Sequence, residues 1–403
     1  MANDWTALCQ PIVQQFIREH ERGDPYQLAL QAKKHPDIPI QLVARQIQAR
    51  QKAKKKLPEW YQAEGIVFPP LLSMEQCSSE ATAKYKSGLV SGKTAIDLTG
   101  GAGVDTYYLN QSFEEFHYVE QNLQLAEIAR YNFHQLGSSA IQTHVGDAKA
   151  FLTSISPVDL IYLDPARRDD LNQKVFRLSD CSPDVTQLLS QLMEKADKVL
   201  VKASPMLDIN QAIQDLDLVQ EIHVVAVNNE CKEVLYLLSS QAIKDPKICA
   251  VDLTSDTPPL TFTRREETEV RISFAEPQQF IYEPNTAILK AGAFRTVAQR
   301  WQLAKLHPNT HLYTSEKLIS DFPGRTFRLE AVLPYRKKEV QAHIPSKKAN
   351  ITTRNFGDSV ATVRKKLGLR DGGDTYLFAT RIQNKQQALL LMQKVRTNNY
   401  YEH

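Results

Sequence analysis

The chain has 403 residues, of which 42% are hydrophobic and 24% are charged, with 15 glycines and 20 prolines. This composition excludes a disordered or fibrous chain, and the length predicts more than one folding unit, since most domains are about 100–150 residues long. The net charge of +3, from 49 basic and 46 acidic residues, neither indicates nor excludes a polyanionic partner.

Residues 1–80 are predicted to form a helical region. Up to about residue 60, Gln, Ala, Leu, Ile and Arg recur at helical spacing between four prolines, which indicates several short helices. Residues 33–60 carry eight basic and two acidic residues. The last basic segment, 41–57, is equally consistent with a solvated helix face and with contact to nucleic acid. The four prolines are Pro11, Pro25, Pro36 and Pro58.

Residues 81–245 are predicted to form an α/β domain. Short apolar runs alternate there with helical stretches, which indicates a parallel sheet covered by helices. Two later β-like runs, 220–227 and 233–239, are separated by five residues, which are too few for a crossover helix. We therefore expect these two strands to be antiparallel neighbours. The five earlier runs are 94–98, 116–119, 141–145, 159–163 and 198–201.

The remaining chain is predicted to contain small α+β domains. In residues 246–332, β-like runs at 270–275 and 327–333 flank a helical stretch at 287–305. Residues 333–403 combine basic helices with a strand at 375–382. Within 334–370, ten basic residues stand against two acidic ones: Arg336, Lys337, Lys338, Lys347, Lys348, Arg354, Arg364, Lys365, Lys366 and Arg370.

The cysteines and the hydropathy pattern bear on the compartment. The five cysteines are far apart and form no C-x-x-C pair, so we predict neither a disulfide framework nor a bound metal. There is no run of about 18 apolar residues, and the first residues are too polar for a signal peptide. We expect a cytoplasmic protein that does not associate with a membrane. The sequence does not predict its oligomeric state.

Residues 95–103, Ala-Ile-Asp-Leu-Thr-Gly-Gly-Ala-Gly, predict a strand that ends in an acid and a glycine-rich turn that opens a helix. Glycine permits the sharp turn and a close approach of ligand to backbone. The Asp97 carboxylate would repel a pyrophosphate but attract S-adenosylmethionine, which carries a sulfonium and an ammonium and no phosphate. Thr106 also stands where G-x-G-x-x-G has its last glycine. The glycines alone are also consistent with a tight turn that binds nothing.

Acidic residues follow two more strands of the predicted sheet. Glu120 ends the second strand, 23 residues after Asp97, where a carboxylate accepts hydrogen bonds from ribose hydroxyls. Asp147 follows the third strand, near the expected position of an adenine amino group. Ligands of such sheets bind at the carboxyl ends of the strands, so we expect all three acids to converge on one crevice.

Over about residues 80–240, these motifs resemble the class I S-adenosylmethionine-dependent methyltransferases. The resemblance implies a Rossmann-like, seven-stranded domain whose last strand is antiparallel. It also implies that Asp97, Gly101 and Gly103 form the first cofactor motif, that Glu120 contacts the ribose and that Asp147 contacts the adenine. Thr99 stands where the family usually has its first glycine, and we count it among the cofactor-binding candidates.

Residues 159–168 predict a buried strand that ends in Asp164-Pro165-Ala166-Arg167. This end resembles the Asp-Pro-Pro-aromatic motif of methyltransferases that act on nucleobases, with Ala166 and Arg167 in place of the second proline and the aromatic. Carbon methylation through a thiolate needs a cysteine after the fifth strand, where this chain has Lys202-Ala203-Ser204-Pro205. Methylation of nitrogen or oxygen needs mainly alignment and a proton acceptor.

We therefore predict Asp164, Pro165 and Arg167 as catalytic residues, with Asp164 also close to the cofactor. Arg167 and Arg168 are equally consistent with phosphate binding and with a salt-bridged loop. Lys202 and Ser204 are further candidates for lining the pocket, because they follow the adjoining strand.

The whole layout resembles a bacterial methyltransferase family with a THUMP-like C-terminal domain. The resemblance rests on residues 97–103, 164–167, 202–208 (Lys-Ala-Ser-Pro-Met-Leu-Asp) and 282–288 (Tyr-Glu-Pro-Asn-Thr-Ala-Ile). It implies a ferredoxin-like domain at about 278–332 and then a THUMP-like unit of a type associated with structured RNA. The basic residues of 334–370, with Phe356 and Tyr376 as candidate exposed rings, agree with RNA binding, although they are also consistent with a solubilising surface.

Taken together, the sequence predicts a methyltransferase that modifies a nitrogen of a base in transfer or ribosomal RNA. One alternative is an RNA-binding protein that has kept the fold and lost catalysis, as the replaced residues Ala166 and Arg167 suggest. A methyltransferase for a small molecule or a protein is another, because no pocket residue identifies the acceptor. The acidic turn and the antiparallel closing pair argue against a nicotinamide-dependent oxidoreductase.

Overall fold

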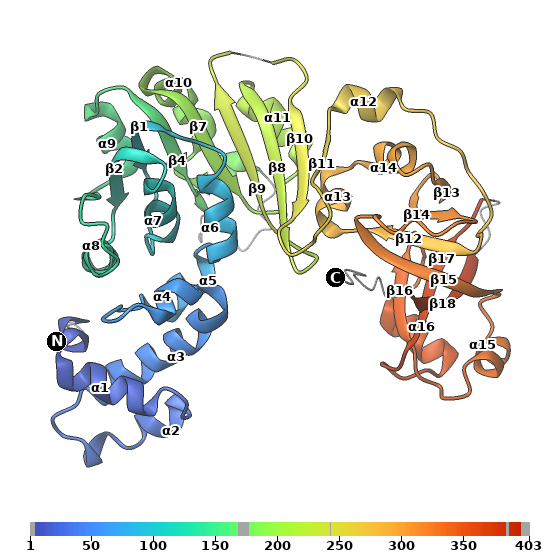
Figure 1. Cartoon of the computed structure of the whole chain (residues 1–403), viewed down its shortest axis with the longest axis horizontal. Coiled ribbons are helices and arrows are strands. Elements are labelled where there is room, and N and C mark those ends of the chain that lie inside the picture. Colours follow the sequence, from blue (N-terminus) through green and yellow to red (C-terminus); the bar gives the residue numbers. More distant parts are fainter. Residues whose placement is uncertain (1–4, 168–176, 242, 384–386, 396–403) are drawn as a thin grey trace, which may run out of the picture. The chain divides into compact units, whose positions relative to one another are not determined.

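The computed structural model describes residues 5–167, 177–241, 243–383 and 387–395 (Figure 1). The chain divides into two compact units. Unit 1 comprises Met1–Glu221 and Glu233–Ile243, and unit 2 comprises Ile222–Lys232 and Lys244–His403. No helix in the described ranges is long and apolar enough to cross a membrane.

Short helices build the first part of unit 1, as the sequence predicts. Pro11, Pro25 and Pro58 each occupy the first turn of a helix, where the missing N–H costs no hydrogen bond. Ala53 of α3 and Trp60 of α4 pack in one core with Tyr108 of α7 (Val104–Asn110), so this region is anchored to the α/β domain. The helices are η1 (Trp5–Cys9), α1 (Pro11–His20), α2 (Pro25–Ala29), η2 (Ala32–Lys34), α3 (Ile40–Lys56), α4 (Pro58–Gln62), α5 (Leu71–Gln76) and α6 (Glu80–Ser87).

A nine-stranded sheet follows, in the order β11-β10-β8-β9-β7-β4-β1-β2-β3. The sheet is parallel from β7 to β3, and β9 runs antiparallel to β7. The predicted neighbours β8 and β9 lie side by side, and β10 and β11 extend the sheet beyond the seven strands expected. Asn228 and Asn229 join β8 to β9 with positive φ, as in a tight hairpin turn. The strands are β1 (Gly92–Asp97), β2 (Phe113–Glu120), β3 (Gln142–Val145), β4 (Val158–Leu163), β7 (Ala196–Ala203), β8 (Val219–Val227), β9 (Glu230–Ser239), β10 (Lys247–Asp252) and β11 (Leu260–Phe262).

Helices connect the parallel strands, and a small ladder lies after β4. In that ladder, β5 (Ala166–Arg167) pairs with β6 (Cys181–Ser182). Leu160–Leu163 and Val199–Val201 are buried, because central parallel strands are covered on both faces. The helices are α7 (Val104–Asn110), α8 (Leu123–Gln135), α9 (Ala148–Ser154), η3 (Leu178–Asp180), α10 (Val185–Lys195) and α11 (Ile209–Leu216).

Unit 2 contains a seven-stranded sheet in the order β13-β14-β12-β15-β18-β17-β16. Only β16 and β17 pair in parallel among the pairs described, and apolar residues of the central strands form its core. Its elements are β12 (Phe280–Pro284), α13 (Thr286–Ala291), α14 (Phe294–Arg300), β13 (Ala304–His307), β14 (Thr310–Ser315), β15 (Gly324–Leu333), α15 (Lys337–His343), β16 (Asn350–Arg354), α16 (Val360–Leu367), β17 (Thr375–Arg381) and β18 (Gln387–Lys394).

Two element predictions in unit 2 are wrong. The stretch 270–275 is not a strand: it follows α12 (Arg264–Glu269), and Phe274 makes only an isolated bridge to Lys305. The stretch 287–305 is not one helix, because Gly292 adopts φ 78° and ends α13. A second helix and then strand β13 follow, since the left-handed conformation at Gly292 stops helical hydrogen bonding.

Candidate functional site

The glycine-rich loop after β1 is shaped by three glycines with different roles. Gly101 and Gly103 adopt φ 54° and 78°, a region that other residues avoid, and Gly103 immediately precedes α7. At Gly100, a Cβ atom would lie 2.2 Å from a ring carbon of Tyr118. Sequence reasoning assigned no role to Gly100, because a close approach by a neighbouring strand leaves no mark in the loop itself.

Asp97 lies inside this loop with only 1% of its surface exposed. Its Oδ1 accepts hydrogen bonds from the backbone N–H and the hydroxyl of Thr99, at 2.9 and 3.3 Å. Its Oδ2 accepts one from the Thr106 hydroxyl at 2.7 Å. Burial raises the pKa of Asp97 to about 7. The carboxylate therefore organises the loop from within and is close to balanced between its two protonation states at neutral pH.

Glu120 connects the end of β2 to the same loop. Its two carboxylate oxygens accept hydrogen bonds from the backbone N–H groups of Gly101, at 2.8 Å, and Asn122, at 2.7 Å. Its backbone carbonyl accepts one from Gly146 at 3.0 Å, which draws the end of β3 toward β2. The side chain of Asp147 caps α9 by accepting from Ala150 N–H. A hydrogen bond thus links the glycine-rich loop directly to the Glu120 side chain. Asp147 is linked to Glu120 only indirectly, through the backbone hydrogen bond of Gly146.

Two apolar side chains lie exposed beside these acids. Leu123, at the start of α8, has 58% of its surface exposed, and Val145, at the end of β3, has 53%. Leu123 follows Glu120 by three residues and Val145 precedes Asp147 by two. Single exposed apolar side chains are common, but an apolar, planar ligand group held by the acids would cover these two.

Asp164, after β4, is held by its backbone and by its side chain. Its N–H donates to the Thr99 hydroxyl at 2.6 Å, and its Oδ2 forms an ion pair with the ammonium of Lys202, near the end of β7. Burial alone would lower the pKa of Lys202, but the carboxylates of Asp164, Asp105 and Glu233 raise it above its ordinary value. Thr99 therefore joins the glycine-rich loop to the strand end that carries the predicted catalytic residues.

The sequence predicts that Lys202 lines the pocket, but its pairing with Asp164 emerges only from the register of the two strands. Leu163 of β4 lies opposite Val201 of β7, so the residues that follow them lie at the same point on neighbouring parallel strands. Ser204 accepts a hydrogen bond from Met206 N–H. Arg167 belongs to the β5–β6 ladder through its backbone, and Arg168 lies outside the described residues.

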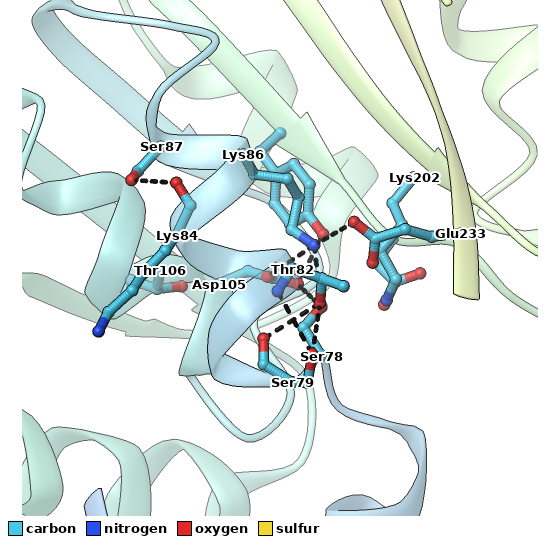
Figure 2. A network of polar contacts seen from close by, with 12 residues as sticks. Ser78, Ser79, Thr82, Lys84, Lys86, Ser87, Asp105, Thr106, Lys202 and Glu233 are labelled. Atoms are coloured by element: carbon cyan, nitrogen blue, oxygen red, sulfur yellow. Dashed lines mark hydrogen bonds and ion pairs between the residues drawn. The ribbon is translucent and has the colours of Figure 1, made fainter. Parts of the chain in front are cut away.

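A network of buried charges lies beside Lys202 (Figure 2). Lys86 is fully buried and pairs with Glu233 at 2.7 Å and with Asp105 at 3.2 Å. Asp105 Oδ2 also accepts hydrogen bonds from the hydroxyls of Ser78, at 2.8 Å, and Tyr162, at 2.7 Å. Burial raises the pKa of Glu233, whereas Lys86 and Lys202 outweigh burial at Asp105 and lower its pKa. Sequence reasoning missed this network because its members come from distant segments.

Comparison with solved structures identifies the family. A crystal structure described as that of a "putative methyltransferase" from Porphyromonas gingivalis W83 is 36% identical to this chain, with a TM-score of 0.85. The match covers 98% of this chain and 100% of the other. The chain belongs to this methyltransferase family. The predicted class I S-adenosylmethionine-dependent methyltransferase fold and the family with a THUMP-like domain are thereby confirmed.

Family models match the C-terminal part of the chain. A ferredoxin-like domain matches residues 280–323, and a THUMP domain-like model matches residues 324–394. The two ranges share the seven-stranded sheet of unit 2, because β12 of the first range pairs with β15 of the second. A comparison with curated proteins finds no match.

Two weaker structural likenesses concern other methyltransferases. TrmK from M. capricolum, solved with S-adenosylhomocysteine, is 12% identical with a TM-score of 0.32, and the match covers 40% of this chain and 68% of TrmK. A "putative RNA methyltransferase" from Pyrococcus horikoshii is 16% identical with a TM-score of 0.31, and the match covers 47% of this chain and 96% of the other. Likenesses this weak do not bear on the function.

The predicted exposed rings of the THUMP-like domain prove to be packed. Phe356 is half-buried against an apolar core and meets the Tyr335 ring edge-on at 5.2 Å between centroids. Tyr376 is half-buried and packs against Phe327. The prediction of exposed stacking platforms is wrong, because both rings complete the core.

Ion pairing divides the ten basic residues of 334–370 into two groups. Four have acidic partners: Arg336 with Glu339, Arg354 with Glu283, Arg364 with Asp371 and Lys366 with Asp358. The other six are exposed and have no ion pair among the described residues. We call these six the basic patch: Lys337, Lys338, Lys347, Lys348, Lys365 and Arg370.

The basic segment of α3 is partly structural. Arg50 is buried and donates to Glu21 and to the carbonyl of Tyr61. Lys56 donates to the carbonyls of Met74 and Glu75, and burial lowers its pKa. These two cations support the packing of helices, whereas Arg45, Lys54 and Lys55 are exposed.

Proposed function

We propose that this protein transfers the methyl group of S-adenosylmethionine to a nitrogen of a base in structured RNA, either transfer or ribosomal RNA. The observation that carries the proposal is the chain of contacts at one edge of the sheet. It runs from Glu120 through the glycine-rich loop to Thr99, and from Thr99 to Asp164 and Lys202. A donor site and an acceptor site at the two ends of this chain would be adjacent.

The residues at the donor end suit S-adenosylmethionine. When bound, S-adenosylmethionine would supply an electrophilic methyl group on a positively charged sulfur. The loop offers the Asp97 carboxylate, and its glycines leave space that larger side chains would fill. Glu120 is positioned to accept hydrogen bonds from ribose hydroxyls, and the exposed Leu123 and Val145 suit an adenine ring. We assign to cofactor binding Asp97, Thr99, Gly101, Gly103, Glu120, Asp147 and Asp164.

The acceptor end suits a nitrogen that carries a hydrogen atom. Asp164 Oδ2 is occupied by Lys202, and no group of the described residues bonds to Oδ1, while the side chain is 35% exposed. Oδ1 can accept a hydrogen bond from an acceptor N–H and aim the nitrogen lone pair at the methyl group. As the N–C bond forms and the S–C bond breaks, the nitrogen loses its proton to Oδ1 or to solvent. Pro165 stiffens this strand end, and Arg167 is assigned to the acceptor side.

The basic patch supports RNA as the substrate. Arg370 N–H donates to the Lys347 carbonyl, and a Cβ atom at Gly368 would lie 3.0 Å from Lys337 Cε. The ends of α15 and α16 therefore bring cations from separate segments together. Unpaired, exposed cations of this density bind phosphates without selecting a sequence, so they would hold RNA while the pocket selects the base.

Methyl transfer tests the proposal directly. Purified protein is incubated with methyl-labelled S-adenosylmethionine and with RNA from a strain that lacks the gene, and digested nucleosides are analysed by mass spectrometry. We expect one N-methylated nucleoside, and a loss of at least about 100-fold in rate for Asp164→Asn. If the protein methylates only small molecules or proteins, RNA is not its acceptor. Binding of cofactor and RNA without any transfer would show a catalytically silent RNA-binding protein.

A further inference from the structure

We propose that Lys202 is a positioning residue for methyl transfer, which holds one oxygen of Asp164 and thereby presents the other oxygen to the acceptor nitrogen. This inference rests on the proposed function and gives a specific role to Lys202, which the sequence predicts only as a residue that lines the pocket. It follows from the strand register, the contacts of Asp164 and the buried charges beside Lys202.

The strand register places the two side chains together. β4 and β7 are parallel neighbours, and Leu163 lies opposite Val201. Asp164 and Lys202 each follow one of these paired residues, so both lie at the carboxyl edge of the sheet. Their ion pair joins Lys202 Nζ to Asp164 Oδ2.

Asp164 is held at two points, which leaves one oxygen in a defined place. Its backbone N–H is fixed by the Thr99 hydroxyl and its Oδ2 by Lys202. Free rotation of the carboxylate would move both oxygens, and the ion pair restricts that rotation. A hydrogen-bond acceptor that is oriented in advance contributes more to a reaction than one that must be ordered during the reaction.

Buried acids near Lys202 favour its charged form. The carboxylates of Asp105 and Glu233 attract its ammonium, and its side chain is only 12% exposed. Lys86 pairs with both of these acids and limits their net charge (Figure 2). The ammonium is therefore paired with Asp164 and is attracted by two further buried carboxylates, which favours the charged form that the ion pair needs.

A cycle of variants separates a positioning role from a structural one. Single-turnover transfer is measured for the parent, Lys202→Met, Lys202→Arg, Asp164→Asn and the double variant of Met at 202 with Asn at 164. We expect Lys202→Met to slow transfer by about 10- to 100-fold, with the Kd for S-adenosylmethionine changed by less than about threefold. Lys202→Arg should restore part of the rate. In the Asp164→Asn background, Lys202→Met should slow transfer by less than about threefold, because it acts through the carboxylate.

Lys198→Met provides a matched control, since Lys198 lies exposed on the same strand and is outside the site. It should transfer at the parental rate. Circular dichroism and thermal unfolding establish that each variant is folded at the assay temperature, and Lys202→Arg keeps the charge if the Met variant does not fold.

The outcomes distinguish this inference from the proposed function. An active parent with an equally active Lys202→Met, or single effects that multiply fully in the double variant, would overturn the role of Lys202 alone. A parent that transfers no methyl group to any RNA would overturn the proposed function and this role with it.

Discussion

Replacing Asp97 by Asn should remove a pH dependence from cofactor binding. Burial raises the pKa of this carboxyl to about 7, so the ligand-free protein holds it partly protonated at neutral pH. A bound sulfonium cation favours the ionised carboxylate. Binding of S-adenosylmethionine should therefore release a proton from Asp97 when the pH is below about 7.

The expected size follows from the pKa. If only the ionised form binds, the apparent Kd exceeds its limiting value by about 11-fold at pH 6 and about 2-fold at pH 7, a ratio of roughly 5. Over this range the amino group of the ligand stays charged, since free α-amino groups titrate near ~8. The pH change therefore reports on the protein.

Isothermal titration calorimetry at pH 6 and 7, in buffers of different ionisation enthalpy, measures both the Kd and the released proton. The parent should bind about fivefold more tightly at pH 7 and release close to one proton at pH 6. Asp97→Asn should bind more weakly and show neither effect. The reasoning would be refuted if this variant bound as tightly as the parent or kept the same pH slope.

Three further predictions concern stability and RNA binding. Gly100→Ala should lower the free energy of unfolding by about 1–3 kcal/mol in chemical denaturation, because its Cβ would lie 2.2 Å from a tyrosine ring, whereas Gly146→Ala has no atom within 4 Å to meet and should change it by less than ~0.5 kcal/mol. Without cofactor, the raised pKa of Asp97 stabilises the folded protein below pH ~4, and this contribution of up to roughly 4 kcal/mol is lost as the pH rises to about 7. The free energy of unfolding of Asp97→Asn should not show this decrease, and equal pH profiles for parent and variant would exclude a raised pKa at Asp97. Replacing Lys337 and Lys365 by Gln should weaken RNA binding and flatten its salt dependence by about 1–2 in log–log slope, while Arg at both positions should keep both values; an unchanged slope would exclude these lysines as phosphate contacts.

The parts of the fold that could be predicted are those encoded in local patterns. An apolar run followed by an acid identified the ends of β1 and β2, because buried parallel strands leave a short hydrophobic signal with a polar residue at the end. The closing pair of strands followed from a linker too short for a helix. The helix predicted at 287–305 failed because one glycine, Gly292, with positive φ outweighed a periodic pattern around it.

The parts that could not be predicted depend on which segments become neighbours. The pairing of Asp164 with Lys202 requires the register of β4 against β7, which the sequence does not display. In the sequence Lys86 has the character of an exposed helix cation, and its burial is possible because Asp105 and Glu233, the latter 147 residues away, pair with it. Likewise, the sequence around Phe356 predicts an exposed ring, whereas in the structure the ring packs against an apolar core built from other segments.

An experimental structure with S-adenosylhomocysteine bound tests the assignment of the cofactor edge most directly. We predict that the ribose hydroxyls will lie within hydrogen-bonding distance, ~2.7–3.2 Å, of the Glu120 carboxylate, with the sulfur between the glycine-rich loop and Asp164. A ligand bound elsewhere on the protein, or one whose ribose makes no contact with Glu120, would contradict the account.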